Sequence, residues 1–212
     1  MSNTSDLWYD WLGLNTWLFK KINSISGEQI YDFLMKVASS FGNKELLPYF
    51  LSIIIAYAVI SLMWRIFAQK GGNKYYAIAW FNIFLIMAGG LYAGKESVTY
   101  IQKHFAFPRP YVALHGKVKQ LEKLPADEAY KSFPSIHVAF ITIMVIALWP
   151  ALNENFRWAG IGLICAVSWS RMALGVNYPM DVISGFMIML IEMLIIRTIY
   201  YGLINRIFKT GF

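Results

Sequence analysis

Three polar clusters in the sequence contain residue types that bind and transfer phosphate. They are Arg109-Pro110, then Pro134-Ser135-Ile136-His137, then Ser170-Arg171 with Asn177 and Asp181, and each lies at an end of a long apolar segment. A guanidinium group binds two phosphate oxygens at once, and histidine passes a proton near neutral pH. The clusters therefore indicate a phosphate site, provided that one membrane surface brings them together.

The second cluster begins an apolar segment, where the first turn of a helix presents free backbone N–H groups to an anion. Ser135 is placed to cap this helix or to donate a hydrogen bond to phosphate. His137 lies just inside the helix and is placed to protonate a leaving oxygen. The alternative is a helix cap followed by a buried histidine that bonds a backbone carbonyl.

Arginines of the first and third clusters are the candidate phosphate ligands. Two prolines flank Arg109 and hold it in a stiff, extended turn, although an arginine at a membrane surface can also simply bind lipid phosphate. Arg171 either binds a substrate phosphate or forms a structural ion pair with Asp181. In the functional case, Asp181 orients the side chain four residues earlier, which is Asn177.

Composition indicates a polytopic membrane protein. The chain of 212 residues is 58% hydrophobic and 15% charged, with a mean hydropathy of +0.47, and these values are unlike those of ordinary soluble domains. A helix that spans a bilayer needs about 20 apolar residues. We therefore expect an all-α membrane helix bundle of five transmembrane helices, at residues 46–64, 75–94, 136–152, 158–174 and 182–204.

The first 45 residues hold no uncharged run long enough to cross a bilayer. Apolar residues at helical spacing predict two amphipathic helices that lie in the membrane interface. One covers residues 7–19, and the other carries Ile30, Phe33, Leu34 and Val37. The alternative is a short sixth span. We therefore divide the chain into an N-terminal interfacial segment, 1–45, and a membrane domain, 46–212.

Span order places the three clusters at the same membrane face, because consecutive spans run in opposite directions. Arg65, Lys70 and Lys74 in the first loop, with basic residues near the C-terminus, favour a cytoplasmic location for the opposite face. We therefore expect an integral protein of a bacterial cytoplasmic membrane whose clusters face the periplasm or the exterior. Residues 95–131 hold seven Lys/Arg and four Asp/Glu, a basic excess that suits an anionic lipid or substrate.

Cysteine and charge content bear on the other classes of site. The single cysteine, Cys165, allows no intramolecular disulfide and no cysteine-based metal site, and we expect it to pack in the core. The net charge of +7 suits a protein beside anionic lipid, and no basic run interleaved with aromatic residues suggests nucleic acid. We expect the bilayer and a phosphorylated lipid as partners, without a metal or other cofactor, and the sequence predicts no particular oligomeric state.

The clusters resemble the motifs of the type 2 phosphatidic acid phosphatase family, membrane members of the lipid phosphatase and haloperoxidase superfamily. The family pattern is Lys-x6-Arg-Pro, Pro-Ser-Gly-His and Ser-Arg-x5-His-x3-Asp, and the resemblance covers about residues 46–204. It implies metal-independent hydrolysis of a lipid phosphomonoester or pyrophosphate through a phosphohistidine. It makes Arg109 and Arg171 phosphate ligands, His137 the general acid and Asp181 the residue that orients the nucleophile.

Three positions depart from the family pattern. The family lysine falls at Gln102, while Lys103 is one residue later and about 100° around a helix. Lys103 joins Ser135 among the candidate phosphate ligands, and Gln102 and Ser170 are weaker candidates. Ile136 replaces a glycine, which a helical backbone tolerates. Asn177 occupies the nucleophile position, where an amide cannot form a phosphorylated intermediate.

The asparagine, whether natural or introduced, leaves two hypotheses. One is a lipid phosphatase that is impaired at Asn177, because loss of a covalent nucleophile raises the barrier to hydrolysis. The alternative is a catalytically silent, phosphatase-like membrane protein that binds lipid phosphate or a protein partner. His104 and His115 are weaker candidates for a replacement nucleophile. Phosphatidate, phosphatidylglycerophosphate, undecaprenyl pyrophosphate and lipid A phosphates present the same anion, so the sequence does not select a substrate.

Overall fold

The computed structural model describes residues 5–114 and 116–209, and every regular element within them is helical. The prediction of an all-α fold is therefore confirmed. Two short 3-10 helices cover Trp11–Gly13 and Ala126–Glu128. The α-helices of the described chain are α1 (Ser5–Asp10), α2 (Leu14–Ser24), α3 (Gln29–Ser40), α4 (Leu47–Phe67), α5 (Asn73–Phe105), α6 (Pro110–Ala113), α7 (Ile136–Leu148), α8 (Glu154–Ala173) and α9 (Pro179–Lys209).

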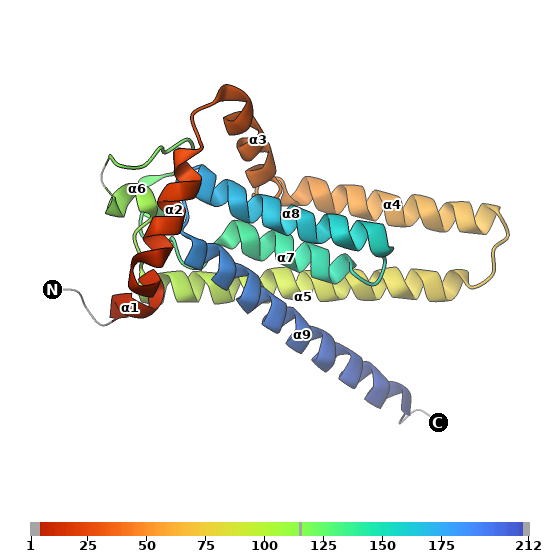
Figure 1. Ribbon diagram of the computed structural model, residues 1–212. Coiled ribbons are helices and arrows are strands. Elements are labelled where there is room, and N and C mark those ends of the chain that lie inside the picture. The colour runs from red at the N-terminus through yellow and green to blue at the C-terminus, as the bar shows by residue number, and fades with distance from the viewer. Residues whose placement is uncertain (1–4, 115, 210–212) are drawn as a thin grey trace.

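Helix α7 is the central helix of the bundle, and α5, α8 and α9 pack around it (Figure 1). Its sequence, IHVAFITIMVIAL, is apolar on every side, which is the pattern of a helix buried all round. Val138 and Ile141 belong to a core cluster with residues of α2 and α8. Ala139 and Ile143 belong to a second cluster with residues of α5 and α9. Helix α7 therefore joins the two larger apolar cores of the molecule.

Within residues 5–114 and 116–209, three helical segments are long and apolar enough to span a membrane. They are α4, the 73–113 segment that contains α5, and the Pro179–Ile204 part of α9. Helix α7 has 13 residues, about 20 Å of helix, which is shorter than the ~30 Å hydrocarbon core. Neighbouring helices cover it, however, so it needs little contact with lipid. The expected count of five or six spans stays a prediction.

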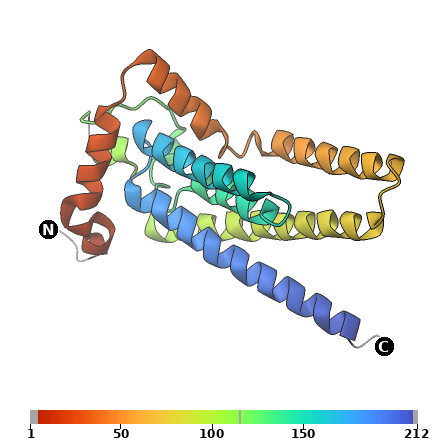
Figure 2. The same ribbon diagram turned by 45° about the vertical axis from the view of Figure 1, so that its right-hand side comes forward.

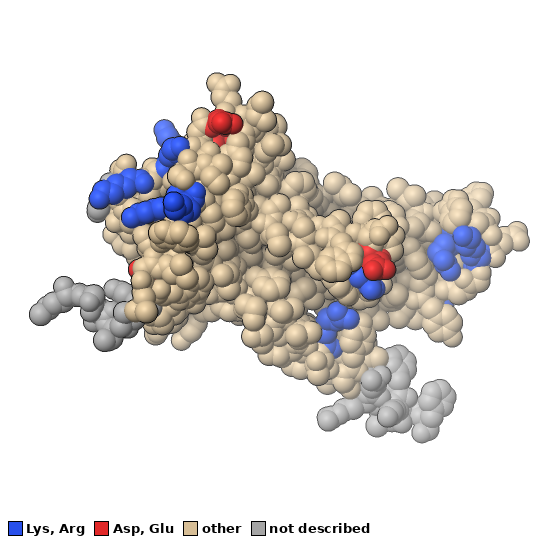
Figure 3. All heavy atoms as spheres, in the orientation of Figure 1, with Lys and Arg blue, Asp and Glu red and all other residues tan. Residues whose placement is uncertain are grey.

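The outer surface of α4 is apolar and exposed. Ala58 is its buried residue, whereas Ile53, Ile60 and Met63 are each more than half exposed. Figure 3 shows lysine and arginine side chains over α2 and the loop beside it and over the turn between α4 and α5, with a mostly uncharged surface between these two ends. An apolar surface of this size is typical of contact with a membrane.

The expected single helix over residues 7–19 is wrong, because the chain turns between α1 and α2. Trp11, Leu12 and Gly13 have positive φ values of 47°, 57° and 95°, and glycine adopts this region without a side-chain clash. The Asp10 carboxylate accepts hydrogen bonds from the backbone N–H of Thr16 at 3.2 Å and from its hydroxyl at 2.7 Å. These bonds stabilise the first turn of a new helix rather than a continuation of α1.

The N-terminal helices pack against one end of the bundle (Figure 2). Helix α2 contacts α8 and α9, and α3 contacts α8. Helix α3 leaves Ile30, Phe33, Leu34 and Val37 exposed, so the apolar stripe expected from the sequence is present. The location of this stripe in a membrane interface and the domain boundary after residue 45 stay predictions.

The expectation that Cys165 packs in the core is wrong. Cys165 is exposed on α8, whereas its neighbour Ile164 is buried. Adjacent residues on a helix point about 100° apart. An apolar segment alone therefore does not show which of its side chains face the protein and which face its surroundings.

Candidate functional site

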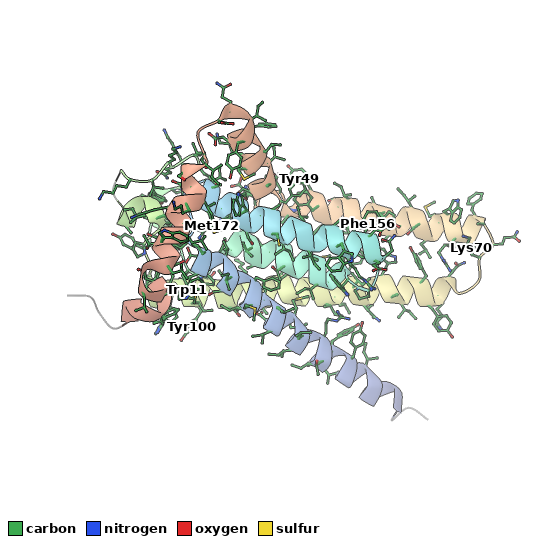
Figure 4. All side chains as sticks on the ribbon, viewed as in Figure 1. Trp11, Tyr49, Lys70, Tyr100, Phe156 and Met172 are labelled. Carbon is green, nitrogen blue, oxygen red and sulfur yellow. The ribbon has the colours of Figure 1, made fainter. Side chains whose placement is uncertain are left out.

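Four helix ends meet at one end of the bundle. They are the C-terminal ends of α5 and α8 and the N-terminal ends of α7 and α9 (Figure 1). In Figure 4, Met172 marks this end, and Lys70 marks the opposite tip at the turn between α4 and α5. We call residues 102–114, 116–135 and 170–182, which lie at this first end, the polar end of the bundle.

Hydrogen bonds join the three polar clusters at the polar end. Arg109 Nη1 donates to the carbonyl oxygen of Val176 at 3.0 Å, which joins the first cluster to the third. The backbone N–H of Ser135 donates to the carbonyl oxygen of Asp181 at 3.0 Å, which joins the second cluster to the third. The structure therefore brings the clusters together at one end, as the order of the spans predicts.

Asn177 lies at the centre of a buried hydrogen-bond network and is 2% exposed. Its Oδ1 accepts from Arg171 Nε at 3.2 Å and from Ser135 Oγ at 3.4 Å. Its Nδ2 donates to the Ser132 carbonyl oxygen at 2.8 Å and to Asp181 Oδ2 at 3.3 Å. The residue at the family's nucleophile position thus contacts both a candidate phosphate ligand and the carboxylate proposed to orient it.

Asp181 is fully buried, and its carboxylate accepts hydrogen bonds from four donors. The Tyr9 hydroxyl donates to Oδ1 at 2.6 Å. The Ser132 hydroxyl donates to Oδ2 at 2.6 Å and the backbone N–H of Tyr178 at 2.7 Å, and Asn177 is the fourth donor. A buried charge is costly unless such partners compensate for lost hydration, so this arrangement fixes the carboxylate in one orientation.

Arg171 is fully buried and pairs with Glu122. Its Nη1 donates to Glu122 Oε2 at 2.7 Å and to the Ser39 hydroxyl at 2.7 Å. The alternative of a structural ion pair between Arg171 and Asp181 is wrong, because Asp181 is bonded to other donors and Glu122 supplies the anion. A glutamate 49 residues away in the chain therefore neutralises this arginine.

Arg109 is 3% exposed and binds the segment that leads into α7. Its Nε donates to the Glu128 carbonyl oxygen at 2.8 Å, and its Nη2 pairs with Glu128 Oε2 at 3.3 Å. Pro110, the first residue of α6, fixes the backbone here and lacks the N–H that a helix start leaves unpaired. Arg109 is therefore held between α6, the 3-10 helix at Ala126–Glu128 and the turn before α9.

Close backbone contacts enclose the first turn of α7. Ser135 is the N-cap residue, but its hydroxyl donates to Asn177 and makes no capping bond. A Cβ atom added to Gly185 of α9 would lie 2.7 Å from the Ser135 carbonyl oxygen, and one added to Gly42 would lie 2.6 Å from the His137 carbonyl oxygen. Both positions therefore need glycine, because a side chain there would keep α9 and the turn after α3 from approaching the first turn of α7. His137 itself is partly exposed at this turn.

Gln102 is buried, whereas Lys103 is exposed on the surface of α5. Gln102 Nε2 donates to the Pro134 carbonyl oxygen at 3.0 Å and to the Lys131 carbonyl oxygen at 3.3 Å. Gln102, which stands at the family's lysine position, therefore supports the turn that leads into α7. The structure does not bring Lys103 into the network, and its role as a phosphate ligand stays a prediction.

The weaker candidates lie apart from the network. Ser170 is buried, but its hydroxyl donates to the Val167 carbonyl oxygen of the same helix at 2.7 Å. His104 is exposed and stacks on Tyr100, with ring centroids 6.3 Å apart. His115 lies outside the described residues. Within residues 5–114 and 116–209, no group of three or more His, Cys, Asp or Glu side chains is arranged to hold a metal ion.

Sequence reasoning missed five residues of this network. The two glutamates had an available signal, because a buried arginine requires an anion and the loop before α7 supplies carboxylates. Tyr9 and Ser39 come from the segment that the sequence marks only as amphipathic, and no local pattern connects them with α8 or α9. The five residues are Tyr9, Ser39, Glu122, Glu128 and Ser132.

Tyr9 is held among aromatic rings beside the carboxylate. Its ring stacks on Phe107 with centroids 4.2 Å apart, and Trp8 and Phe133 meet it edge-on. Burial, and then the negative charge of Asp181, raise the pKa of Tyr9 well above its usual value of 10. The phenol therefore stays protonated near neutral pH and keeps donating its hydrogen bond.

The described residues form an all-helical fold that has helices long and apolar enough to span a membrane and that brings two buried arginines, a histidine and a carboxylate to one end. The sequence model of the PAP2 superfamily matches residues 79–204. This match covers more than half of the chain, so the chain belongs to the PAP2 superfamily, and the resemblance inferred from the motifs is confirmed. The chain is thus an integral membrane protein of a lipid phosphatase family.

One solved structure supports the fold assignment. The chain is similar to the crystal structure of Aquifex aeolicus LpxE, with a TM-score of 0.63 and 20% sequence identity. The match covers 87% of this chain and 95% of the other. At this identity the likeness shows the fold alone. A search of curated proteins found no match to the sequence.

Proposed function

We propose that the polar end is the phosphate site of a membrane lipid phosphatase, and that Asn177 at the nucleophile position impairs its activity. The observation that carries this proposal is that Asn177 contacts both Arg171, at 3.2 Å, and Asp181, at 3.3 Å. A covalent nucleophile needs a group that holds the substrate beside it and a group that orients it. The substrate is a phosphomonoester or pyrophosphate of a membrane lipid, whose tail remains among the helices.

The chemistry follows from the positions of these groups. Arg109 and Arg171 bind the phosphate oxygens, and Ser135 supplies a hydroxyl donor. With histidine at position 177, a ring nitrogen attacks phosphorus, so a P–N bond forms while the P–O bond to the lipid breaks. His137 gives its proton to the departing lipid oxygen. Water then attacks the phosphorus of the phosphorylated histidine, so a new P–O bond forms while the P–N bond breaks. His137 accepts a proton from that water, and inorganic phosphate and the free histidine are released.

The amide of Asn177 has no basic nitrogen with which to form the P–N bond. The binding groups and the general acid remain, so the chain keeps the recognition part of the reaction and lacks its covalent step. Each ~1.4 kcal/mol added to the barrier slows a reaction tenfold. We therefore expect hydrolysis by the unaltered chain to be slower than that of its Asn177→His variant by at least about a hundredfold.

The direct test compares release of inorganic phosphate by the unaltered chain, Asn177→His and the matched amide control Asn177→Gln. The protein is held in detergent micelles with a chelator, and the panel contains phosphatidate, phosphatidylglycerophosphate, prenyl pyrophosphate and lipid A phosphate. Release by Asn177→His alone supports the proposal and names the substrate. Equal rates for all three proteins contradict the role of position 177.

The orientation of the site in the membrane belongs to the same proposal. The end of α4, the turn after it and the start of α5 carry Arg65, Lys70 and Lys74 respectively, and such basic residues favour the cytoplasmic side. The polar end then faces the periplasm or the exterior of a bacterial cytoplasmic membrane. A thiol-specific reagent that cannot cross membranes tests this orientation with a cysteine introduced at Lys123, in a Cys165→Ser background. Labelling from the cytoplasmic side alone contradicts it.

A second candidate function is a catalytically silent protein that binds lipid phosphate. The observation that favours it is the complete pairing of the Asn177 amide, whose oxygen and nitrogen both have partners of the correct kind. An amide donates and accepts at once, so the network suits asparagine as it stands. This candidate predicts saturable binding of phospholipid headgroups without phosphate release, even in Asn177→His.

A further inference from the structure

Arg171 and Arg109, the two arginines among the candidate phosphate ligands, each pair with a glutamate from the same loop. Glu122 Oε2 lies 2.7 Å from Arg171 Nη1, and Glu128 Oε2 lies 3.3 Å from Arg109 Nη2. A guanidinium presents the same fork of N–H donors to a carboxylate and to a phosphate. The two glutamates therefore occupy places that oxygens of a bound phosphate would take.

The two glutamates lie on the solvent side of the arginines. The side chains of Arg171 and Arg109 are 1% and 4% exposed, whereas those of Glu122 and Glu128 are each 28% exposed. An anion that approaches from outside thus meets the carboxylates before it reaches either guanidinium. The two glutamates therefore cover the guanidinium groups on the side that faces solvent.

Charge gives the same result. The Glu122 carboxylate pairs with Arg171, and the Glu128 carboxylate pairs with Arg109 and, through Oε1 at 3.0 Å, with Lys131. A phosphate dianion placed beside these two carboxylates is repelled, and like charges in contact strongly disfavour binding. The site therefore accepts phosphate only after the glutamates move away from the arginines.

The loop has anchored ends around the segment that carries the glutamates. On one side, Lys119 bonds the Ser24 and Ser26 carbonyl oxygens, and the backbone N–H of Leu121 donates to the Leu174 carbonyl oxygen at 3.1 Å. On the other side, Gln102 holds the Lys131 carbonyl oxygen. Residues 122–128 lie between these anchors, and Arg109 also holds the Glu128 carbonyl oxygen at 2.8 Å. The segment can therefore shift while the loop stays attached, once its bonds to the arginines are broken.

We propose that residues 122–128 form a self-inhibitory lid, in which Glu122 and Glu128 act as internal phosphate mimics that a substrate phosphate must displace. The proposal rests on the proposed function of the polar end and adds the regulation of that site. The lid excludes weakly binding anions, and a lipid phosphate opens it by taking over both arginines. The broken pairs are replaced by arginine–phosphate contacts of the same geometry.

Isothermal titration with inorganic phosphate tests the lid without requiring hydrolysis. The proteins are the unaltered chain, Glu122→Gln and the matched control Asp127→Asn, all in detergent micelles. Asp127 lies in the same segment, but its exposed carboxylate pairs with Lys131 and touches neither arginine. We expect Glu122→Gln to bind phosphate about tenfold more tightly than the unaltered chain, and Asp127→Asn to bind within about twofold of it.

Equal or weaker binding by Glu122→Gln overturns the lid, and if the unaltered chain still binds phosphate, the proposed function survives. Phosphate binding by none of the three proteins overturns the proposed function and the lid with it. Backbone hydrogen exchange in the unaltered chain gives a second measurement that needs no substitution. Saturating phosphate should speed exchange in residues 122–128 and leave α7 unchanged, and slowed or unchanged exchange in this segment overturns the lid.

Discussion

The polar end and the opposite end of the bundle bury different kinds of groups. At the polar end Arg109, Arg171 and Asp181 are almost fully buried, and each is bonded to several partners. The opposite end, which we call the hairpin end, consists of residues 57–83 and buries an apolar cluster of Ala58, Trp80 and Ile83. A buried polar group is costly when a partner is lost, whereas apolar contacts tolerate exchange within the same shape. The polar end is therefore the part of the molecule that single substitutions damage most.

Cavity size does not locate the site. The hairpin end has a cavity of about 400 Å³, large enough for part of a small ligand. Four of its nine lining residues are aromatic, and among the described residues the lining includes no charged side chain: Tyr57, Tyr76, Ala79, Trp80, Asn82, Ile83, Pro150, Ala151 and Tyr201. A phosphate needs positive charge or several donors, and the polar end supplies both. Charge and hydrogen-bond geometry therefore identify the phosphate site better than volume does.

Removal of the central carboxylate has the largest expected effect on stability. Asp181→Ala leaves the Tyr9 and Ser132 hydroxyls without their acceptor, and we expect a loss of about 3 to 5 kcal/mol in the free energy of unfolding. Thermal unfolding in micelles measures this loss, with Glu154→Ala at the far end of α8 as a control expected to stay near zero. A loss below about 1 kcal/mol would show that the network is not a stability element.

Two glycines of α9 compare its two ends directly. A Cβ at Gly185 would lie 2.7 Å from the Ser135 carbonyl oxygen, whereas a Cβ at Gly202 meets nothing within 4 Å. We expect Gly185→Ala to destabilise the protein by about 1 to 3 kcal/mol through overpacking. Gly202→Ala should be neutral or slightly stabilising, because alanine favours a helix. Equal melting temperatures for the two variants contradict the tight packing of α9 on the start of α7.

Loss of the phenol hydroxyl has a smaller expected effect. Tyr9→Phe removes one hydrogen bond to Asp181 and should cost about 1 to 2 kcal/mol at neutral pH. The pKa of Tyr9 is raised above 10 in the folded protein, so the folded state holds this proton more tightly than the unfolded state. The advantage over Tyr9→Phe should be constant below pH 10 and decline as pH rises above it. A difference in melting temperature that grows above pH 10 runs against this sign.

The smallest effect is expected on the outer surface of α4. Ile60 is 65% exposed, so Ile60→Leu exchanges one lipid-facing side chain for another of equal size. We expect a change within about 0.5 kcal/mol, measured by thermal unfolding in lipid nanodiscs. A loss above about 1 kcal/mol would mean that this face packs against a protein surface rather than lipid.

The sequence predicts the positions at which charged residues end apolar helices, because such residues are rare in a membrane and need partners. Arg109, Arg171 and Asp181 can therefore be predicted from the sequence as a group, and the order of the spans predicts that they lie at one end. The residues that bond Arg171 and Asp181 cannot be predicted in this way. Glu122 and Tyr9 reach the site through loop and N-terminal packing, over separations of 49 and 172 residues. Contacts of that kind depend on the whole fold rather than on local spacing.

The N-terminal region shows a second limit of sequence patterns. Its apolar spacing predicts one continuous helix over residues 7–19, but the backbone turns at Gly13, where glycine tolerates positive φ and the Asp10 carboxylate starts α2. Periodicity detects an apolar face and does not detect a competing cap. The turn matters for the candidate site, because it places Tyr9 beside Asp181.

Equilibrium binding of orthovanadate, a phosphate analogue, tests directly whether the polar end binds phosphate. The proteins compared are the unaltered chain, Arg171→Ala and Arg157→Ala. The two arginines lie at opposite ends of α8, so this pair of variants changes the same residue type in the same helix. We expect the unaltered chain and Arg157→Ala to bind orthovanadate saturably, and Arg171→Ala to lose this binding. Undiminished binding by folded Arg171→Ala would contradict the assignment of the polar end as a phosphate site.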